Sequence, residues 1–427
     1  MYPQPFGESL PRVVPGEVVD PSAGAPQRPS RTEPERGPRV ALLSLRDVRP
    51  IADFGGLHEA EDVLVETLSA SLYRVVLASP RFSRRPFDSA PMRRMLSSTR
   101  LVRPYRIEHH QPGSGAMARD VLVILASDVA DAAALLGVPG WHELGEKVLL
   151  HIGVVTESEL RRHPELVGQL RRRVDALFSG TEMPPLGHLR SDRLRTVGVV
   201  PALLDVLAFA TRTDDERTID VFSPGPERPG QHQLLQRWAD AQGGRYQHDI
   251  GRLGAITSPA QHRRIFTTMA TRSRLLLTNY SQSDRRHGGQ HRGVSGRFYD
   301  AMAAGCALVG DLPASSRQFS AYVAGAQPLS LPSDAVRLPS ELAEALGDPA
   351  ESRRLGLAAR EAALRRNDVA HRWLEMVTLA GLPESAGIRE RIGALAAMAD
   401  TLHTDDPTEA DTDTGPSTDV GAAGDVP

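Results

Sequence analysis

One stretch, from Gly293 to Gly310, constrains the fold of this chain more than any other part of its sequence. It combines a Gly-x-x-Gly turn, a short helix that begins near Ser295, a glycine stop at Gly305 and a run of small apolar residues typical of a buried strand. A helix followed directly by a buried strand is part of a βα repeat. The stretch therefore predicts a parallel sheet covered by helices.

The amino terminus of this predicted helix suits an anion. The first backbone amides of a helix have no partner within it, and the helix dipole places partial positive charge there, so phosphate groups bind well. Arg297 adds a guanidinium fork, and Asp300, one turn further, can accept hydrogen bonds from the two vicinal hydroxyls of a ribose. Gly293, Ser295, Gly296, Arg297 and Asp300 together predict a donor site for a nucleotide sugar.

The same residues carry a family resemblance. The segment 297–309 contains an aromatic residue, an acidic residue and Ala-x-Ala-x-Gly ahead of a buried strand, and it resembles the signature of GT-B glycosyltransferases of the family 1 and family 4 type. The resemblance covers residues 195–382. Two positions depart from it: the family usually has glutamate at Asp300, and many members have an acidic residue at Arg292. Further matching segments are residues 220–229, 262–264, 272–274 and 364–373.

The resemblance implies an α/β fold with two Rossmann-like, doubly wound domains that face a cleft. It implies a transferase that moves a sugar from a nucleotide diphosphate sugar to an acceptor, with no metal and no other cofactor. Gly225 and Arg228 follow the first strand of the second domain, where the family contacts the donor diphosphate. Arg285 belongs to a basic, glycine-bearing segment, residues 281–292, which either closes over the donor phosphates or is a solvated connection.

The first domain is expected to hold the acceptor. Gly55 and Gly56 resemble the glycine-rich loop at the mouth of the GT-B cleft, where glycine lets an acceptor approach the backbone closely. An inverting transfer needs a general base for the acceptor hydroxyl, and a retaining transfer needs none. His58, His151 and Asp128 are the candidate bases, and a satisfied structural role is the alternative for each.

Composition excludes several other functions. Lys147 is the only lysine, which excludes a Walker-type phosphate loop and argues against a pyridoxal enzyme. Cys306 is the only cysteine, so disulfides and cysteine-rich metal sites are excluded. The sequence contains no concentrated basic region of the kind that binds nucleic acid, so we do not expect a nucleic acid partner. No apolar run approaches the roughly 20 residues of a transmembrane segment and no signal peptide is evident, so we expect a cytoplasmic protein.

Composition and pattern also divide the chain into segments. Residues 1–38 contain nine prolines and no hydrophobic period, and residues 404–427 contain seven acidic residues and no basic one, so we expect a disordered leader and a disordered acidic tail. Residues 39–205 are predicted as the acceptor domain and residues 206–382 as the donor domain. Residues 383–403 are predicted as a helix that packs against the body or, alternatively, forms a dimer contact.

The periodicity predicts the elements of both domains. Strands are expected at residues 40–45, 74–78, 121–126, 148–155, 218–222, 245–248, 275–278, 307–310 and 327–329. Helices are expected at residues 58–72, 128–136, 157–177, 231–242, 259–271, 295–304, 339–346, 351–365 and 388–402. A further helix, residues 368–382, is expected to cross back to the first domain.

Three functions fit this sequence. The first is a glycosyltransferase with an unknown small-molecule, glycan or protein acceptor. The second is a non-catalytic GT-B-like module that binds a nucleotide sugar or a partner, which Arg292 and Asp300 suggest. The third is an enzyme similar to a nucleotide-sugar epimerase, which would act without an acceptor. The donor sugar, its base and the stereochemical course stay open at this point.

Overall fold

The computed structural model describes most of the chain between residues 37 and 402. The described ranges are 37–48, 55–78, 105–111, 119–182, 186–213, 216–224, 229–248, 256, 258–278, 294–310, 312–313, 316–330 and 338–402. The chain divides into two units, Met1–Arg36 and Gly37–Pro427, and every described residue belongs to the second. The predicted leader, except residues 37 and 38, and the predicted tail lie outside the described residues.

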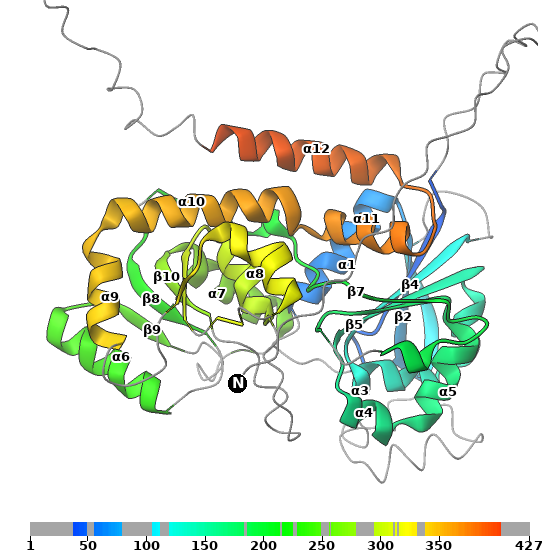
Figure 1. Cartoon of the computed structure of the whole chain (residues 1–427). Helices are drawn as coiled ribbons and strands as arrows, with labels where there is room; N and C mark the ends of the chain where they lie inside the picture. Colours follow the sequence, from blue (N-terminus) through cyan, green and yellow to red (C-terminus); the bar gives the residue numbers. More distant parts are fainter. Residues whose placement is uncertain are drawn as a thin grey trace, which may run out of the picture. The chain divides into compact units, whose positions relative to one another are not determined.

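The first of two sheets has the strand order β3-β2-β1-β4-β5-β6-β7 (Figure 1). Neighbouring strands run parallel, except that β2 and β3 are antiparallel. The order reverses between β1 and β4, and ligands of such sheets bind beyond the carboxyl ends of the strands at this switch point. The strands are β1 (Val40–Ser44), β2 (Ser71–Leu77), β3 (Tyr105–Gln111), β4 (Val121–Asp128), β5 (Lys147–Val154), β6 (Ala176–Ser179) and β7 (Thr196–Val199).

The helices of this part include one correction to the sequence prediction. The helix expected over residues 157–177 is wrong, because Pro164 starts a second helix and residues 176–179 form β6. The ring of a proline disfavours helical backbone angles at the residue before it. His163, which precedes Pro164, accordingly has φ −125° and ψ 58°. The helices are α1 (Gly55–Leu68), α3 (Val129–Ala132), α4 (Glu157–Arg162) and α5 (Pro164–Arg173), with short turns η3 (Ala133–Gly137), η4 (Trp141–Glu143) and η5 (Leu186–Leu189).

The second sheet has the order β12-β11-β10-β8-β9, and all of its neighbours are parallel. Its switch point lies between β8 and β10. The prediction of two doubly wound sheets is confirmed. The elements are β8 (Ile219–Ser223), β9 (Tyr246–His248), β10 (Ser273–Leu277), β11 (Ala307–Gly310), β12 (Leu329–Ser330), α6 (Pro229–Gln242), α7 (Pro259–Thr271), α8 (Gly296–Ala303), α9 (Leu338–Gly347), α10 (Pro349–Arg366), η6 (Val206–Ala208), η9 (Phe319–Val323) and η10 (Ala324–Ala326).

A glycine ends each of the two elements α8 and β11. Gly305 has φ +65°, and its amide and that of Cys306 donate to carbonyl oxygens of the last helical turn, which ends α8 in a Schellman motif. Gly310 ends β11 with φ +146°. A Cβ at Gly310 would lie 2.0 Å from the carbonyl oxygen of Thr278, so the two strands approach closely here only because residue 310 is glycine.

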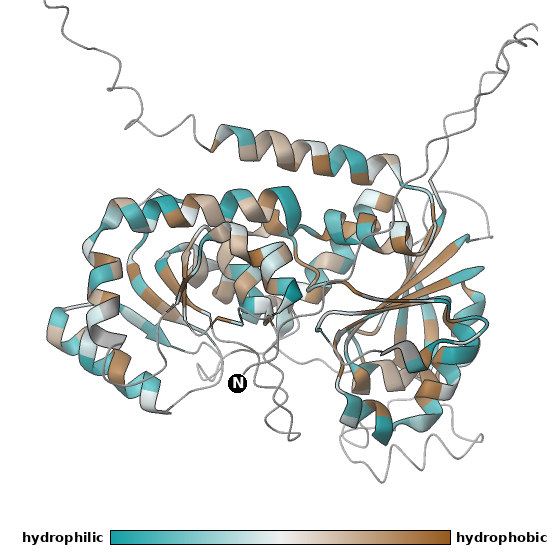
Figure 2. Cartoon of the chain, in the orientation of Figure 1, coloured by the Kyte–Doolittle hydropathy of each residue, from teal (hydrophilic) through white to brown (hydrophobic). Residues whose placement is uncertain are grey.

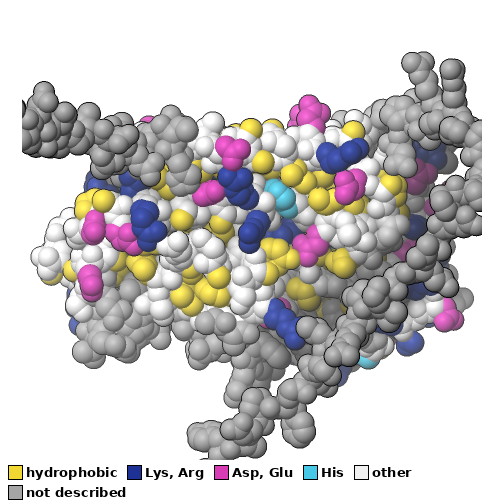
Figure 3. Space-filling model, turned by 45° about the horizontal axis from the view of Figure 1, so that its top comes forward, with side chains coloured by type: hydrophobic (Ala, Val, Ile, Leu, Met, Phe, Trp, Pro, Cys, Tyr) yellow, Lys and Arg dark blue, Asp and Glu magenta, His cyan; other side chains and the backbone are white. Residues whose placement is uncertain are grey.

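The strands of both sheets consist largely of hydrophobic residues, which are brown in Figure 2, and most of these residues are buried. The helices contain both hydrophilic and hydrophobic residues, which appear as teal and brown segments of the same ribbon in Figure 2. On the face turned forward in Figure 3, basic and acidic side chains are interspersed, and the described residues there form no large area of one sign. None of the described helices combines the length and the apolar composition that crossing a bilayer requires.

The last two helices tie the sheets together (Figure 1). In α11 (Val369–Leu379), Trp373 and Met376 belong to the core of the first sheet, which confirms the predicted return to that sheet. In α12 (Ala386–Thr401), Ile388 contributes to the first core, whereas Leu395 and Ala399 contribute to the second. The predicted packing of the last helix against the body is therefore confirmed.

The chain passes between the sheets twice, and the two passages lie side by side. The amide of Val369 donates to the carbonyl oxygen of Leu204 at 2.7 Å, and the amide of Val206 donates to Oδ2 of Asp368 at 3.1 Å. Asp368 is fully buried, and Arg391 of α12 donates to both Asp368 and Asp205. One ion-pair network thus joins both passages to α12.

Candidate functional site

The amino terminus of α8 is anchored on one side and accessible on the other. Phe298 and Tyr299 are buried in the core of the second sheet, as is Val294 just ahead of the helix. Gly296, the first helical residue, is exposed, and a Cβ placed there would meet no atom of the described residues within 4 Å. The side chain of Asp300 is 18% exposed. The helix end predicted to hold phosphate is therefore open to a ligand and firmly held.

A buried arginine that the sequence analysis did not single out lies beside Asp300. Arg263 of α7 is 6% exposed. Its Nη1 donates to Oδ1 of Asp300 at 2.7 Å, and its Nε donates to Oε2 of Glu59 in α1 at 2.8 Å. Its guanidinium carbon lies 4.8 Å from the ring centre of Phe209 and 5.5 Å from that of Phe266. Its Nη2 has no hydrogen-bond partner among the described residues.

The glycine-rich start of α1 lies against the same guanidinium. A Cβ at Gly56 would be 3.4 Å from the guanidinium carbon of Arg263. We call Gly56, Glu59, Arg263 and Asp300 the Arg263 cluster. It brings a predicted acceptor residue, Gly56, and a predicted donor residue, Asp300, to the two sides of one cation. Gly55, the other predicted acceptor residue, is the first residue of α1.

Burial and charge compete within the Arg263 cluster. Burial lowers the pKa of Arg263, but the carboxylates of Asp300 and Glu59 outweigh it, so the net shift of that pKa is upward. Burial raises the pKa of Glu59, and the neighbouring guanidinium offsets only part of this effect. The cluster therefore holds a permanent cation beside a carboxyl group that binds a proton more readily than glutamate in water.

The candidate base His58 lies in the first turns of α1, next to Glu59. Its side chain is half-buried, and burial together with the charge of Arg46 lowers its pKa to about 4. Nη2 of Arg46 donates to the His58 carbonyl oxygen at 3.2 Å. The imidazole is therefore neutral at pH 7 and is a weak proton acceptor.

The other two candidate bases have structural contacts. His151 in β5 is 1% exposed, its Nε2 lies 3.0 Å from the carbonyl oxygen of Val200, and burial lowers its pKa to about 4. A side chain buried in this way belongs to the core, and we do not propose it further as a base. Asp128 ends β4 at the switch point and caps α3, where it accepts from the amide of Asp131 at 2.8 Å.

Four predicted donor residues lie outside the described residues, so their roles stay predictions. They are Gly225, Arg228, Arg285 and Gly293. Ser295 is the N-cap residue of α8 and Arg297 lies in its first turn, as predicted. Among the described residues no group of three or more His, Cys, Asp or Glu side chains could hold a metal ion, and transfer without a metal also stays a prediction.

Comparison with known proteins assigns the part of the chain that contains this site. Residues 208–378 match a family model described as glycosyl transferase-like. A search of curated proteins finds no match.

Among solved structures, a variant of S. aureus TarM in complex with fondaparinux, alpha-GlcNAc-glycerol and UDP is 8% identical, with a TM-score of 0.37 over 61% of this chain and 55% of that one. AviGT4, a glycosyltransferase of avilamycin A biosynthesis, is 15% identical, with a TM-score of 0.35 over 61% and 98%. The pneumococcal O-GlcNAc transferase GtfA in complex with UDP and GlcNAc is 11% identical, with a TM-score of 0.28 over 67% and 57%. The chain thus spans little more than half of the TarM chain.

These structural scores are low, so the likeness to a transferase rests on the match of residues 208–378 to the family model. The matched segment contains the second sheet together with Arg263, Arg297 and Asp300. Residues 208–378, which contain the second sheet, therefore resemble the glycosyl transferase-like family, and the chain has the two doubly wound sheets that the resemblance to GT-B enzymes implied.

Proposed function

We propose that this protein transfers a sugar from a nucleotide diphosphate donor to an acceptor held by the first sheet and α1. The donor diphosphate lies at the open amino terminus of α8, beside Arg297, and Asp300 accepts from the ribose hydroxyls. The match of residues 208–378 to the transferase family and the exposure of Gly296 at the helix start support this placement.

The observation that carries the proposal is the position of Arg263. Its guanidinium joins α1 of the first sheet to α7 and α8 of the second, and its Nη2 has no partner among the described residues. A buried donor that lacks a partner is costly, and a phosphate or sugar oxygen would satisfy it. When the sugar leaves the diphosphate, negative charge grows on the leaving oxygen. A fixed cation and helix amides at that point stabilise the transition state.

The residue that takes the acceptor proton is proposed from the same helix. His58 and Glu59 are neighbours at the start of α1, where Gly56 approaches the cluster. Glu59 is the stronger candidate, because burial raises the pKa of its carboxyl group whereas burial lowers the pKa of the His58 imidazole. In a retaining transfer neither residue would need to act as a base.

Nucleotide binding tests the proposal directly. The thermal midpoint Tm of the full-length chain should rise with at least one of UDP, GDP, ADP and dTDP, because a ligand at about 100 times its Kd adds about 2.7 kcal/mol of stability. The variant Arg297→Ala should weaken that binding by about 10- to 100-fold, the value of a charged contact to phosphate. Arg389→Ala, an exposed arginine of α12, is the matched control. If none of the four nucleotides binds, the proposal is wrong.

A second candidate is a GT-B protein that binds the nucleotide without turnover. The ion pair between Asp300 and Arg263 favours it, since a carboxylate already engaged by a guanidinium has less capacity for ribose hydroxyls. Donor hydrolysis separates the two functions. Release of free sugar from any nucleotide sugar that binds supports the transferase, whereas binding without hydrolysis or transfer across a panel of acceptors supports the second candidate.

A further inference from the structure

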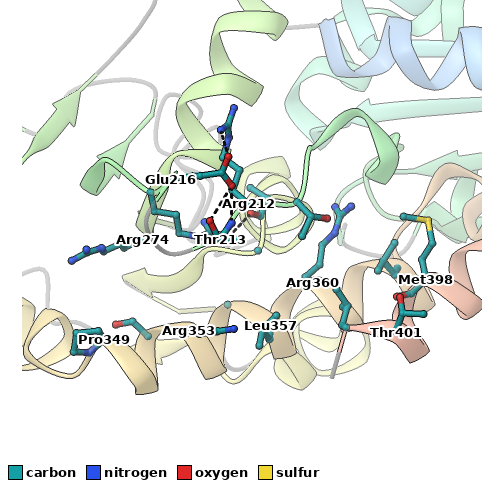
Figure 4. A pocket seen from close by; sticks show the side chains of 18 of the residues that line it. Arg212, Thr213, Glu216, Arg274, Pro349, Arg353, Leu357, Arg360, Met398 and Thr401 are labelled. Atoms are coloured by element: carbon teal, nitrogen blue, oxygen red, sulfur yellow. Dashed lines mark hydrogen bonds and ion pairs between the residues drawn. The ribbon is translucent and has the colours of Figure 1, made fainter. Parts of the chain in front are cut away.

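A pocket of about 430 Å³ lies at the edge of the second sheet opposite to the proposed donor site (Figure 4). Its wall consists of α10, the end of α12, the segments that precede β8 and β11, and the start of β10. These segments meet at the amino-terminal ends of the strands, whereas the proposed donor lies at their carboxyl ends. The volume is within the range of sites for small molecules.

Arginine side chains dominate the charge of this pocket. Among the described residues, five arginines line it, against one acidic residue, Glu216. Arg212 pairs with Glu216 at 3.5 Å, and Arg274 pairs with Asp220, outside the lining, at 3.6 Å. The other three lining arginines are Arg217, Arg353 and Arg360.

Two of these guanidinium groups are bonded to backbone carbonyl oxygens. Arg217 donates to the carbonyl oxygens of Ser273 at 2.6 Å and Ala304 at 3.2 Å. Arg360 donates to the carbonyl oxygens of Val206, Phe209 and Ala303. Neither arginine forms an ion pair with a carboxylate of the described part of the chain. Among the described residues, the contacts of these two guanidinium groups are therefore carbonyl oxygens, and the carboxylates of Asp205 and Asp368 act on Arg360 from further away.

Arg360 is the lining arginine for which burial and an unsatisfied hydrogen-bond donor occur together. It is 4% exposed, and its Nε has no hydrogen-bond partner among the described residues. Burial lowers its pKa to about 10, so the group remains charged at neutral pH. A buried cation without an anionic partner is costly, and an anion in the pocket would offset that cost.

The remainder of the wall combines apolar side chains with the hydroxyl groups of Thr211, Thr213, Ser352 and Thr401. The large side chain of Met398 is 41% exposed although α12 packs on the body, and it faces the same pocket as Arg360. Figure 4 shows Met398 and Thr401 on α12 at one end, with Arg353, Leu357 and Arg360 along α10. The apolar lining residues are Leu346, Leu357, Leu364, Met398 and Leu402. An occupant therefore meets both guanidinium groups and apolar surface.

We propose that this pocket binds an amphiphilic anion, a small molecule with a phosphate head group and an apolar chain. Arginine forks match the geometry of phosphate oxygens, and the leucines and Met398 receive the apolar part. The site is separate from the Arg263 cluster, so the proposal does not depend on the proposed sugar transfer. Nucleotide binding at α8 and anion binding at α10 can each fail without the other.

Binding of dodecyl phosphate to the full-length chain, below the concentration at which it forms micelles, tests this proposal by calorimetry. Dodecyl phosphate should bind at least tenfold more tightly than inorganic phosphate and than dodecanol, because only the first engages both parts of the wall. The double variant Arg274→Gln/Arg353→Gln should lose at least tenfold in affinity for dodecyl phosphate. Arg354→Gln is the matched control, since Arg354 is an exposed neighbour on α10 that does not line the pocket.

A variant with a neutral tail tests whether the acidic residues of 404–427 compete with dodecyl phosphate for the pocket. Leu402 lines the pocket, and the acidic residues of 404–427 follow it in the sequence. The measurement is repeated on the full-length chain with those seven residues changed to Asn or Gln. Binding of dodecyl phosphate in either chain, weakened by the double variant and unchanged by Arg354→Gln, supports the proposal. Equal binding of dodecyl phosphate and dodecanol, equal losses in both variants, or no binding in either chain overturns it.

Discussion

The substitution Arg263→Met tests whether one guanidinium group stabilises the contact of α1, which packs on the first sheet, with α7 and α8, which pack on the second. In the structure Arg263 neutralises Glu59 from α1 and Asp300 from α8, and it stacks near Phe209 and Phe266. Methionine fills a similar space without charge. The variant therefore leaves the carboxylates of Glu59 on α1 and Asp300 on α8 without the cation that lies between them.

The size of the effect follows from the burial of these groups. Removal of one partner of a buried ion pair costs about 3–5 kcal/mol. The side chains of Glu59 and Asp300 are 30% and 18% exposed, so water replaces part of the lost contact and the lower value, about 3 kcal/mol, applies. For large domains 1 kcal/mol corresponds to about 2 °C, which predicts a decrease of about 6 °C in Tm.

The assay is urea unfolding at pH 7, with a thermal scan as a second measure. Arg264→Met is the control, because Arg264 is the next residue of α7 and is exposed. Its change in the free energy of unfolding should stay within about 0.5 kcal/mol. The triple variant Arg263→Met/Glu59→Gln/Asp300→Asn should regain stability relative to Arg263→Met, because it leaves no unpaired carboxylate.

The pH dependence gives an independent check. Burial already raises the pKa of Glu59, and loss of Arg263 removes the charge that counteracts this rise. A carboxyl group whose folded pKa lies above its unfolded value stabilises the folded state as the pH falls, so the deficit of Arg263→Met should shrink between pH 7 and pH 5. If Arg263→Met is as stable as Arg264→Met, or if the triple variant is less stable than Arg263→Met, the reasoning is refuted.

Three further predictions concern other parts of the molecule. Glu59→Gln should lower kcat by about 100-fold or more if Glu59 is the base, whereas His58→Gln should lower it by less than about tenfold, and the reverse order in a transfer assay would exclude Glu59. Burial lowers the pKa of His151 to about 4, so as the pH falls below 6.5 this histidine takes up a proton in the unfolded chain but not in the folded one. The free energy of unfolding should therefore decrease by about 2 kcal/mol between pH 6.5 and pH 5 on account of this group. Unfolding measured at pH 6.5 and at pH 5 should show that His151→Gln lacks this decrease. Gly310→Ala should cost about 3 kcal/mol or more because its Cβ would meet the Thr278 carbonyl, while Gly393→Ala in α12, where a Cβ meets nothing within 4 Å, should gain about 0.5–1 kcal/mol in the same unfolding assay.

Most of the second sheet could be predicted from sequence because β8, β10 and β11 are mainly apolar and several of its helices have clear start and stop signals. Residues 259–271 and 307–310 were predicted with the bounds of α7 and β11, where Pro259 starts the helix and Gly310 ends the strand. Three strands of the first sheet were not predicted. β3 is an edge strand with mostly polar residues, β7 has four residues, and β6 follows α5 after only Val174 and Asp175.

The candidate site was only partly visible in the sequence. Ser295, Arg297 and Asp300 lie on one helix, so their spacing alone places them near one another. Glu59 and Arg263 are 204 positions apart, and their contact depends on how α1 and α7 meet, which no local pattern encodes. His151 shows the opposite case, because a histidine within an apolar run of β5 already carried the signal of a core position.

The two neighbouring passages between the sheets have a mechanical consequence. Leu204 and Val206 on one passage are bonded to Val369 and Asp368 on the other, and Arg391 clamps both. Because the two connections lie side by side, they define a single axis for any rotation of one sheet relative to the other. Rotation of one sheet and its helices about that axis would leave the network around Asp368 intact. It would break the contact between Glu59 and Arg263 and the hydrogen bonds of Gln318 to Gly180 and Glu182. Such a rotation would thus exchange a small number of polar contacts for solvent, and it would require no unfolding of either sheet.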